Sequence, residues 1–199
     1  DPELAENRGQ IELQDTYVLS DSLRVVSGVG LRYQDSYSEG YFSGKVNNQV
    51  RWIFGHMEYR PTNSMSFNLG GYGESNSLGP GTFAPRAAVN YHLSENQSVR
   101  AVYSKGTRTP DLVESRGRMA PSIEGVDPPV MGMTKIAPLV LLQGNSELRP
   151  ERVASIELGH LIALRQWGAT IDTRLFSERL TNLISDYNAN FDIYATNNG

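Results

Sequence analysis

The sequence contains no cysteine among its 199 residues. This absence excludes disulfide bonds, thiolate metal sites and a cysteine nucleophile together, and it leaves the redox compartment undecided. Lysine is also scarce, since it occurs only at positions 45, 105 and 135. The formal net charge is -4, so we expect no nucleic-acid partner.

Long apolar runs are absent as well. The longest, 136–142, is interrupted by Pro138 and falls far short of the roughly 18 residues that a membrane helix needs. A helical membrane protein is therefore excluded. The chain begins Asp1-Pro2-Glu3, without the charged and apolar segments of a signal peptide, so we expect either a processed chain or an internal piece.

What the sequence does contain is a two-residue alternation of apolar and polar side chains. It runs through 23–33 and recurs in 11–19, 53–59, 65–69, 87–91, 99–103, 154–158 and 169–175. Such alternation indicates β-strands with one apolar face. Turn residues near 20, 62, 95 and 166 join these segments in pairs. The pattern predicts an all-β fold of four hairpins, or about eight antiparallel strands of roughly ten residues each.

The connections between the predicted hairpins suggest where the apolar face lies. Short turns alternate with longer linkers at about 36–48, 75–82, 106–150 and 179 onward. Alternating short and long connections are typical of an up-and-down membrane β-barrel, and a soluble sandwich does not require them. Aromatic residues near predicted strand ends fit an interfacial girdle, although ordinary β-propensity also explains them: Tyr33, Trp52, Tyr59, Tyr91, Tyr103 and Trp167.

Two pairs of motifs carry a resemblance to a known family. Residues 83–92 (FAPRAAVNYH) are followed by 99–114 (VRAVYSKGTRTPDLVE), and 144–151 (GNSELRPE) are followed by 156–159 (IELG). These segments resemble the barrel domain of TonB-dependent outer-membrane receptors, with its "PR…Y", "YS.G.R.P…E" and "GN..L.PE….E.G" patterns. The resemblance implies a 22-stranded, plugged barrel in the outer membrane of a Gram-negative bacterium.

The same resemblance implies function and partners. It implies active import of a scarce ligand such as a ferric siderophore, with no enzymatic step and no cofactor. The implied partners are a plug domain of the same parent chain, TonB with its inner-membrane energising complex, and outer-membrane lipid. Eight strands, no evident plug or TonB box, and no terminal aromatic at 195–199 lead us to expect that 1–199 is a partial barrel domain without its C-terminal strands.

Candidate functional residues fall into three groups. The strand pattern predicts that one group faces the barrel lumen, where water or a plug can satisfy charge: Arg86, Arg100, Glu157, Asp172 and Arg174. The residues that match the family motif are expected to have a structural role at the rim: Arg108, Pro110, Glu114, Asn145, Pro150 and Glu151. The predicted extracellular loop 107–150 contains Arg116 and Arg118, which are candidates for contacting an anionic ligand.

Other chemistries find little support. Met119, Met131 and Met133 are expected to pack rather than to bind a metal, and no metal site is predicted. The three histidines, at 56, 92 and 160, lie on separate predicted strands, which weakens haem uptake. No G-x-S-x-G elbow is present. The alternatives are a soluble or surface β-sandwich whose 107–150 loop recognises protein or glycan, and a passive porin.

Overall fold

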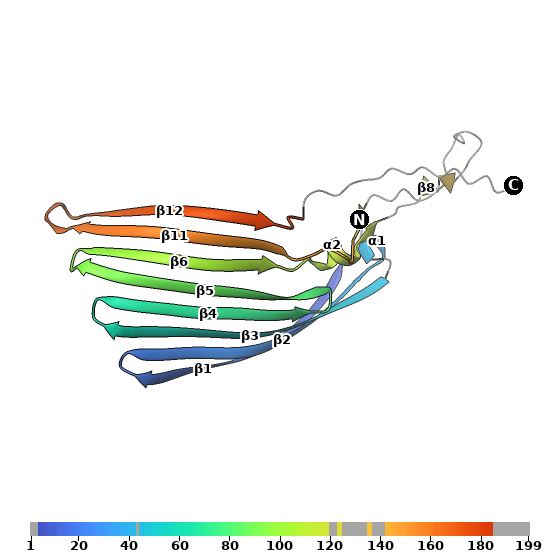
Figure 1. Cartoon of the computed structure of the whole chain (residues 1–199). Helices are drawn as coiled ribbons and strands as arrows, with labels where there is room; N and C mark the ends of the chain where they lie inside the picture. Colours follow the sequence, from blue (N-terminus) through green and yellow to red (C-terminus); the bar gives the residue numbers. More distant parts are fainter. Residues whose placement is uncertain (1–3, 43, 120–122, 125–134, 137–141, 185–199) are drawn as a thin grey trace.

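The computed structural model describes residues 4–42, 44–119, 123–124, 135–136 and 142–184. Eight long strands form one antiparallel sheet in the order β1-β2-β3-β4-β5-β6-β11-β12 (Figure 1). The four predicted hairpins are confirmed. The strands are β1 (Ala5–Ser20), β2 (Leu23–Ser38), β3 (Gly44–Thr62), β4 (Met65–Asn76), β5 (Gly79–Ser94), β6 (Gln97–Arg108), β11 (Glu151–Leu164) and β12 (Ala169–Thr181).

The remaining elements are short and lie in the connections. They are α1 (Glu39–Phe42), α2 (Leu112–Arg116), β7 (Arg118–Met119), β8 (Ile123–Glu124), β9 (Lys135–Ile136), β10 (Leu142–Gln143) and the 3-10 turn η1 (Arg165–Trp167). Strand β7 pairs with β10, and β8 pairs with β9. Within the described residues, none of the helices has the length and apolar character required to cross a bilayer.

The strands are longer than the sequence pattern predicts. They span 12 to 19 residues rather than about ten, because polar segments that read as linkers continue the hydrogen-bonded ladder. Within the predicted linker 36–48, for example, Asn47 pairs with Asp35. Only residues 77–78 separate β4 from β5. The prediction of long connections at 36–48 and 75–82, and hence of a regular alternation, is therefore wrong. The connection between Arg108 and Glu151 is long, as predicted.

The sheet has one apolar face that the other described residues leave uncovered. Tyr17, Val25, Met57, Leu69 and Ala87 pair in sequence across five strands, and the line continues through Tyr103 to Ile156. Many apolar side chains on this face are exposed. A soluble sandwich would cover them with a second sheet, but the described residues form one large layer. The sandwich alternative is therefore wrong for this fold.

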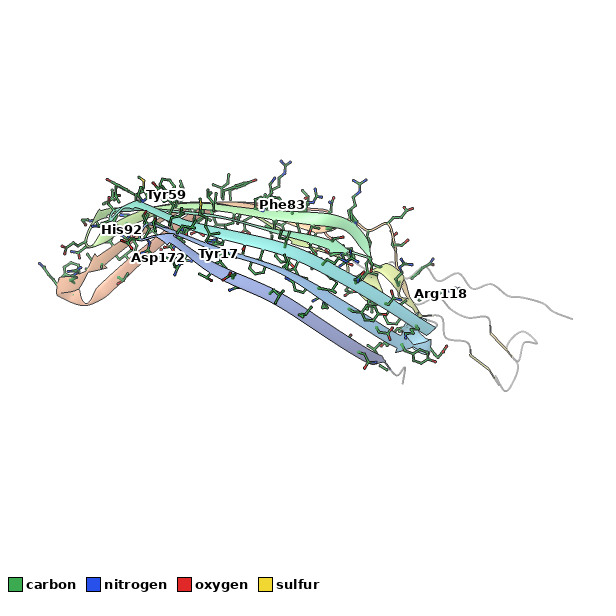
Figure 2. All side chains as sticks on the ribbon, turned by 90° about the horizontal axis from the view of Figure 1, so that it is seen from below. Tyr17, Tyr59, Phe83, His92, Arg118 and Asp172 are labelled. Atoms are coloured by element: carbon green, nitrogen blue, oxygen red, sulfur yellow. The ribbon has the colours of Figure 1, made fainter. Side chains whose placement is uncertain are left out.

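The sheet is an open, curved wall with two free edges. Figure 2 shows it nearly edge-on, with Tyr59 and Phe83 on the convex side. Strands β1 and β12 lie at the two ends of the sheet order, so each leaves one row of backbone groups without a ladder partner among the described residues. Such edges require further strands in a membrane, where unpaired backbone groups are costly.

Burial is concentrated on the concave face, near the end that has the long connection. The buried apolar residues of the described chain are Val50, Trp52, Leu78 and Leu112. The Trp52 ring lies across Gly30, where an added Cβ would approach it to 2.1 Å, and its Nε1 donates to Glu12 Oε2 at 2.9 Å. Helix α2, at the start of the long connection, also contacts β3.

The two faces make a testable prediction in the full-length protein. Leu158→Arg places a charge on the convex face, where Leu158 is 57% exposed, and should lower the free energy of unfolding in a bilayer by about 2–4 kcal/mol. Leu161→Arg is the matched control, because Leu161 lies on the concave face opposite Asp172 and should tolerate the charge. Unfolding by denaturant in lipid vesicles measures both. Equal losses for the two variants would contradict the assignment of faces.

Candidate functional site

A cluster of charged side chains lies on the concave face of β5, β6, β11 and β12. The five residues predicted to face the lumen share this side of the sheet, and we call them the lumen cluster: Arg86, Arg100, Glu157, Asp172 and Arg174. With His56, Asn68 and Asn90 from neighbouring positions, most of them line a polar cavity of about 500 Å³.

Two ion pairs order the lumen cluster. Arg100 donates from Nε to Glu157 Oε1 at 2.9 Å, with a second contact from Nη2 at 2.8 Å. An added Cβ on Gly159 would approach Arg100 Nε to 2.7 Å, so the glycine gives the guanidinium room to cross from β6 to β11. Arg174 pairs with Asp172 at 2.6 Å. Among the described residues Arg86 has no ion-pair partner, so the cluster carries an excess of one positive charge.

A second group of residues joins the ends of β6 and β11 at the rim. Arg108 makes two parallel hydrogen bonds to Glu114, from Nη1 at 3.0 Å and Nη2 at 2.9 Å. Its Nε donates to Glu151 Oε2 at 2.5 Å. The guanidinium therefore links helix α2 to the first residue of β11, although Arg108 and Glu151 are far apart in the chain. Bidentate geometry of this kind requires arginine rather than lysine.

Helix α2 is fixed by a capping box. Asp111 Oδ1 accepts from the backbone N–H of Glu114 at 2.7 Å, and Glu114 Oε2 accepts from the backbone N–H of Asp111 at 2.8 Å. The Glu114 carboxylate thus accepts hydrogen bonds both from the N-cap backbone and from Arg108. The Asp111-x-x-Glu114 spacing is the sequence signal for this helix, and strand periodicity does not reveal it.

The second family motif packs against the same helix. The backbone N–H of Asn145 donates to the carbonyl of Glu114 at 2.8 Å, and Asn145 Oδ1 accepts from the N–H of Glu147 at 2.8 Å. Pro110 and Pro150, the prolines of the two motifs, are fully buried. The structure thus brings all six motif residues to one place at the rim. None of them lies in the lumen cluster.

Ionisation of the two rim carboxyls is favoured by Arg108. For Glu114, partial burial opposes ionisation, but hydrogen bonds from Arg108 and from the backbone of Asp111 outweigh it and lower the pKa below its usual range. For Glu151, the hydrogen bond from Arg108, assisted by the backbone N–H of Ile184, lowers the pKa. The same two carboxylates raise the pKa of Arg108, so all three groups are charged at neutral pH.

The candidate ligand contacts lie beyond the rim. Arg116, at the end of α2, and Arg118, in β7, are both exposed. Figure 2 shows Arg118 at the end of the wall that carries the long connection. Both are separate from the lumen cluster, which lies further along the wall.

Of the methionines and histidines singled out in the sequence, those in the described part of the chain are dispersed over it. Met119 is half-buried in β7, whereas Met131 and Met133 lie outside the described residues. His56 lines the cavity of the lumen cluster, but His160 lies on the opposite face, paired with Val99. Over the described ranges, no three His, Asp or Glu residues are grouped closely enough to hold a metal ion.

An eight-stranded wall with an uncovered apolar face and a charged concave face is a segment of a membrane β-barrel. The family model described as TonB dependent receptor-like, beta-barrel, matches residues 5–199. The chain therefore belongs to this family, and it is part of a receptor in the outer membrane of a Gram-negative bacterium. A search of curated proteins found no match.

Solved structures share the fold at low sequence identity. The siderophore receptor PirA from Pseudomonas aeruginosa is 16% identical, with a TM-score of 0.69 over 90% of this chain and 33% of that one. A mutant of the ferric enterobactin receptor PfeA from the same species is 14% identical, with a TM-score of 0.66 over 89% and 27%. The alcaligin receptor FauA from Bordetella pertussis is 15% identical, with a TM-score of 0.50 over 92% and 30%. This chain thus spans about a third of the length of these proteins.

The rim predicts a pH dependence. Because the pKa values of Glu114 and Glu151 are lowered in the folded state, their contribution to rim stability is present above their ordinary value of 4.5 and is lost as the pH falls through the lowered values. Hydrogen-exchange protection of amides 111–117 and 144–151 in the full-length receptor should therefore fall as the pH drops from 6 to about 3.

Arg108→Gln tests the cause of this dependence. At pH 7 it should reduce protection by about tenfold, the lower end of what hydrogen bonds between charged groups contribute, because Arg108 is half exposed. Arg149→Gln is the control, since Arg149 is exposed and has no ion pair within the described part of the chain. Protection that does not change with pH, or that changes equally in both variants, would contradict the role of Arg108.

Proposed function

We propose that this chain is part of a receptor that imports a scarce ligand, a ferric siderophore, across the outer membrane with energy supplied through TonB. The observation that carries the proposal is membership of the TonB-dependent receptor barrel family over residues 5–199. Support for the ligand class comes from two of the similar structures, the siderophore receptor PirA and the ferric enterobactin receptor PfeA. The parent receptor binds and transports its ligand and carries out no covalent chemistry.

The lumen cluster supports the presence of a plug. Charged residues on a barrel interior need water or polar protein to solvate them. The lumen cluster satisfies part of its charge internally through the pairs Arg100–Glu157 and Arg174–Asp172. Arg86 is left to pair with a group outside the described residues. A plug domain of the parent chain supplies that group, and the cluster forms part of the wall that the plug contacts.

The long connection supplies the ligand contacts. It lies at the end of the barrel opposite the short turns, which is the extracellular side in outer-membrane barrels. The rim group around Arg108 anchors both ends of this connection, so that Arg116 and Arg118 project from a fixed base. Two exposed guanidiniums attract an anionic chelate through their field and their hydrogen bonds.

Transport by the full-length receptor tests this function. In a strain that lacks its own siderophore receptors, expression of the receptor should restore uptake of ⁵⁵Fe from a ferric siderophore panel that includes ferric enterobactin, and deletion of tonB should abolish that uptake. Unchanged uptake without TonB would contradict the coupling. Failure of purified receptor to bind any member of the panel would contradict the ligand class.

Variants of the loop arginines test ligand binding separately from transport. The double variant Arg116→Ala/Arg118→Ala should weaken binding of an anionic ferric siderophore by about tenfold at low salt and by less at high salt, because exposed charges are screened. Arg165→Ala, an exposed arginine at the opposite end of the wall, is the matched control and should bind as wild type does. Wild-type binding by the double variant would remove these residues from the ligand site.

A further inference from the structure

A groove opens on the wall where β5 and β6 separate. Their ladder ends at the pair Arg86 and Ser104, although β5 begins at Gly79 and β6 continues to Arg108. Pro85, the next residue along β5, has no N–H to extend the pairing. The groove has a volume of about 930 Å³ and is bordered by residues from β3 to β12.

Four basic side chains border this groove on the convex face. The strand register places them on this face. Lys105 and Arg179 both pair with Ala154, and Arg152 pairs with Thr107, which lies on the same face as Lys105. All four are exposed, and they come from four different strands: Arg51, Lys105, Arg152 and Arg179. Paired strands lie about 4.8 Å apart, so the three spacings from β3 to β6 separate Arg51 from Lys105 sideways by at least roughly 14 Å. Basic groups therefore stand on both sides of the groove.

The groove also has an apolar part. Ile53 and Phe83 border it and are 63% and 64% exposed, which is high for side chains of this size. The Phe83 ring lies over Gly71, where an added Cβ would approach it to 2.9 Å. Figure 2 shows Phe83 on the convex side of the wall. Apolar side chains on this side face lipid in a barrel, so the groove is amphipathic.

The positive charge of the groove is not neutralised within the described residues. Arg51 donates to Gln49 at 3.1 Å, and the Lys105 ammonium lies 6.0 Å from the centre of the Tyr103 ring. Neither contact involves an anion, and no carboxylate within the described ranges pairs with Arg152 or Arg179. Of the described residues that border the groove, Glu74 alone is acidic; it belongs to the concave face and accepts there from Thr109.

On β6 and β11, the groove lies at the end of the apolar band. On β6, Lys105 is two residues beyond Tyr103, and on β11, Arg152 is four residues beyond Ile156, so on these two strands the basic residues follow the apolar band on the side of the long connection. On β3, Arg51 pairs with Leu31 and lies at the edge of the apolar face. Cationic side chains just outside the hydrocarbon region complement lipid phosphates. We propose that this groove binds the phosphate-bearing head group of an outer-leaflet lipid, with Ile53 and Phe83 contacting its apolar part.

This site is independent of the proposed import function, because it uses the opposite face of the wall. Native mass spectrometry of the full-length receptor in detergent, with bisphosphorylated lipid A as the probe, tests it. Wild-type receptor should retain this lipid and should lose most of the binding when both phosphates are removed from the probe. Equal retention of the two lipids would overturn the proposal, and this comparison depends on no variant.

Substitutions then locate the site. Arg152→Gln should weaken retention of lipid A about fivefold, and Lys105→Gln/Arg152→Gln/Arg179→Gln on the order of one hundredfold, because each basic group near a membrane surface contributes about a factor of five. Arg165→Gln removes one charge at the opposite end of the wall and should have no effect. An equal loss in Arg165→Gln would overturn the location. Displacement of the lipid by equimolar inorganic phosphate would show a simple anion site and overturn the lipid assignment.

Discussion

Backbone hydrogen bonding between neighbouring strands is the constraint on which the rest of this structure depends. A strand in hydrocarbon must pair along its whole length, so each of the eight strands here is fixed by its neighbours rather than by a packed core. Continuous pairing in turn assigns every side chain to one of two faces. The two free edges, β1 and β12, show why such a wall must be part of a larger closed sheet.

Arginine has three roles in this wall. The role of each arginine depends on the face of the sheet it occupies and on its position along the strand. Arg100 and Arg174 pair with carboxylates on the concave face, where protein and water can solvate them. Arg108 acts at the rim as a planar linker between a short helix and a strand. Arg152 faces outward at the edge of the apolar band, without an anion among the described residues, and there a lipid phosphate becomes its natural partner.

Much of the fold could be predicted from the sequence, because successive side chains of a strand point to opposite faces of the sheet. The four hairpins and the outward position of residues such as Leu158 were predicted correctly. Strand ends were predicted poorly, because residues 44–49 are polar and glycine-containing like a loop but still form ladder pairs with β2. A strand segment with few alternating apolar side chains has no apolar face that reveals it.

The rim could be predicted only in part. The motif residues were identified, but the convergence of Arg108, Glu114 and Glu151 depends on the connection turning back at Pro110 and returning at Pro150. No local pattern encodes a contact across so long a segment. The Asp111-x-x-Glu114 capping box is visible in the sequence, but a search for strand alternation does not detect it. The separation of β5 from β6 beyond Arg86 was signalled only by Pro85, which by itself does not show that a groove follows.

We infer that alternate residues of each strand face lipid and the barrel interior. The sequence contains no cysteine, so single cysteines can be introduced one at a time at positions 153–163 of β11 in the full-length receptor and spin-labelled in lipid vesicles. Accessibility to oxygen should peak at 154, 156, 158, 160 and 162, and accessibility to a water-soluble nickel complex should be higher at the positions between them. Accessibilities that vary smoothly along β11, without a two-residue period, would contradict the account.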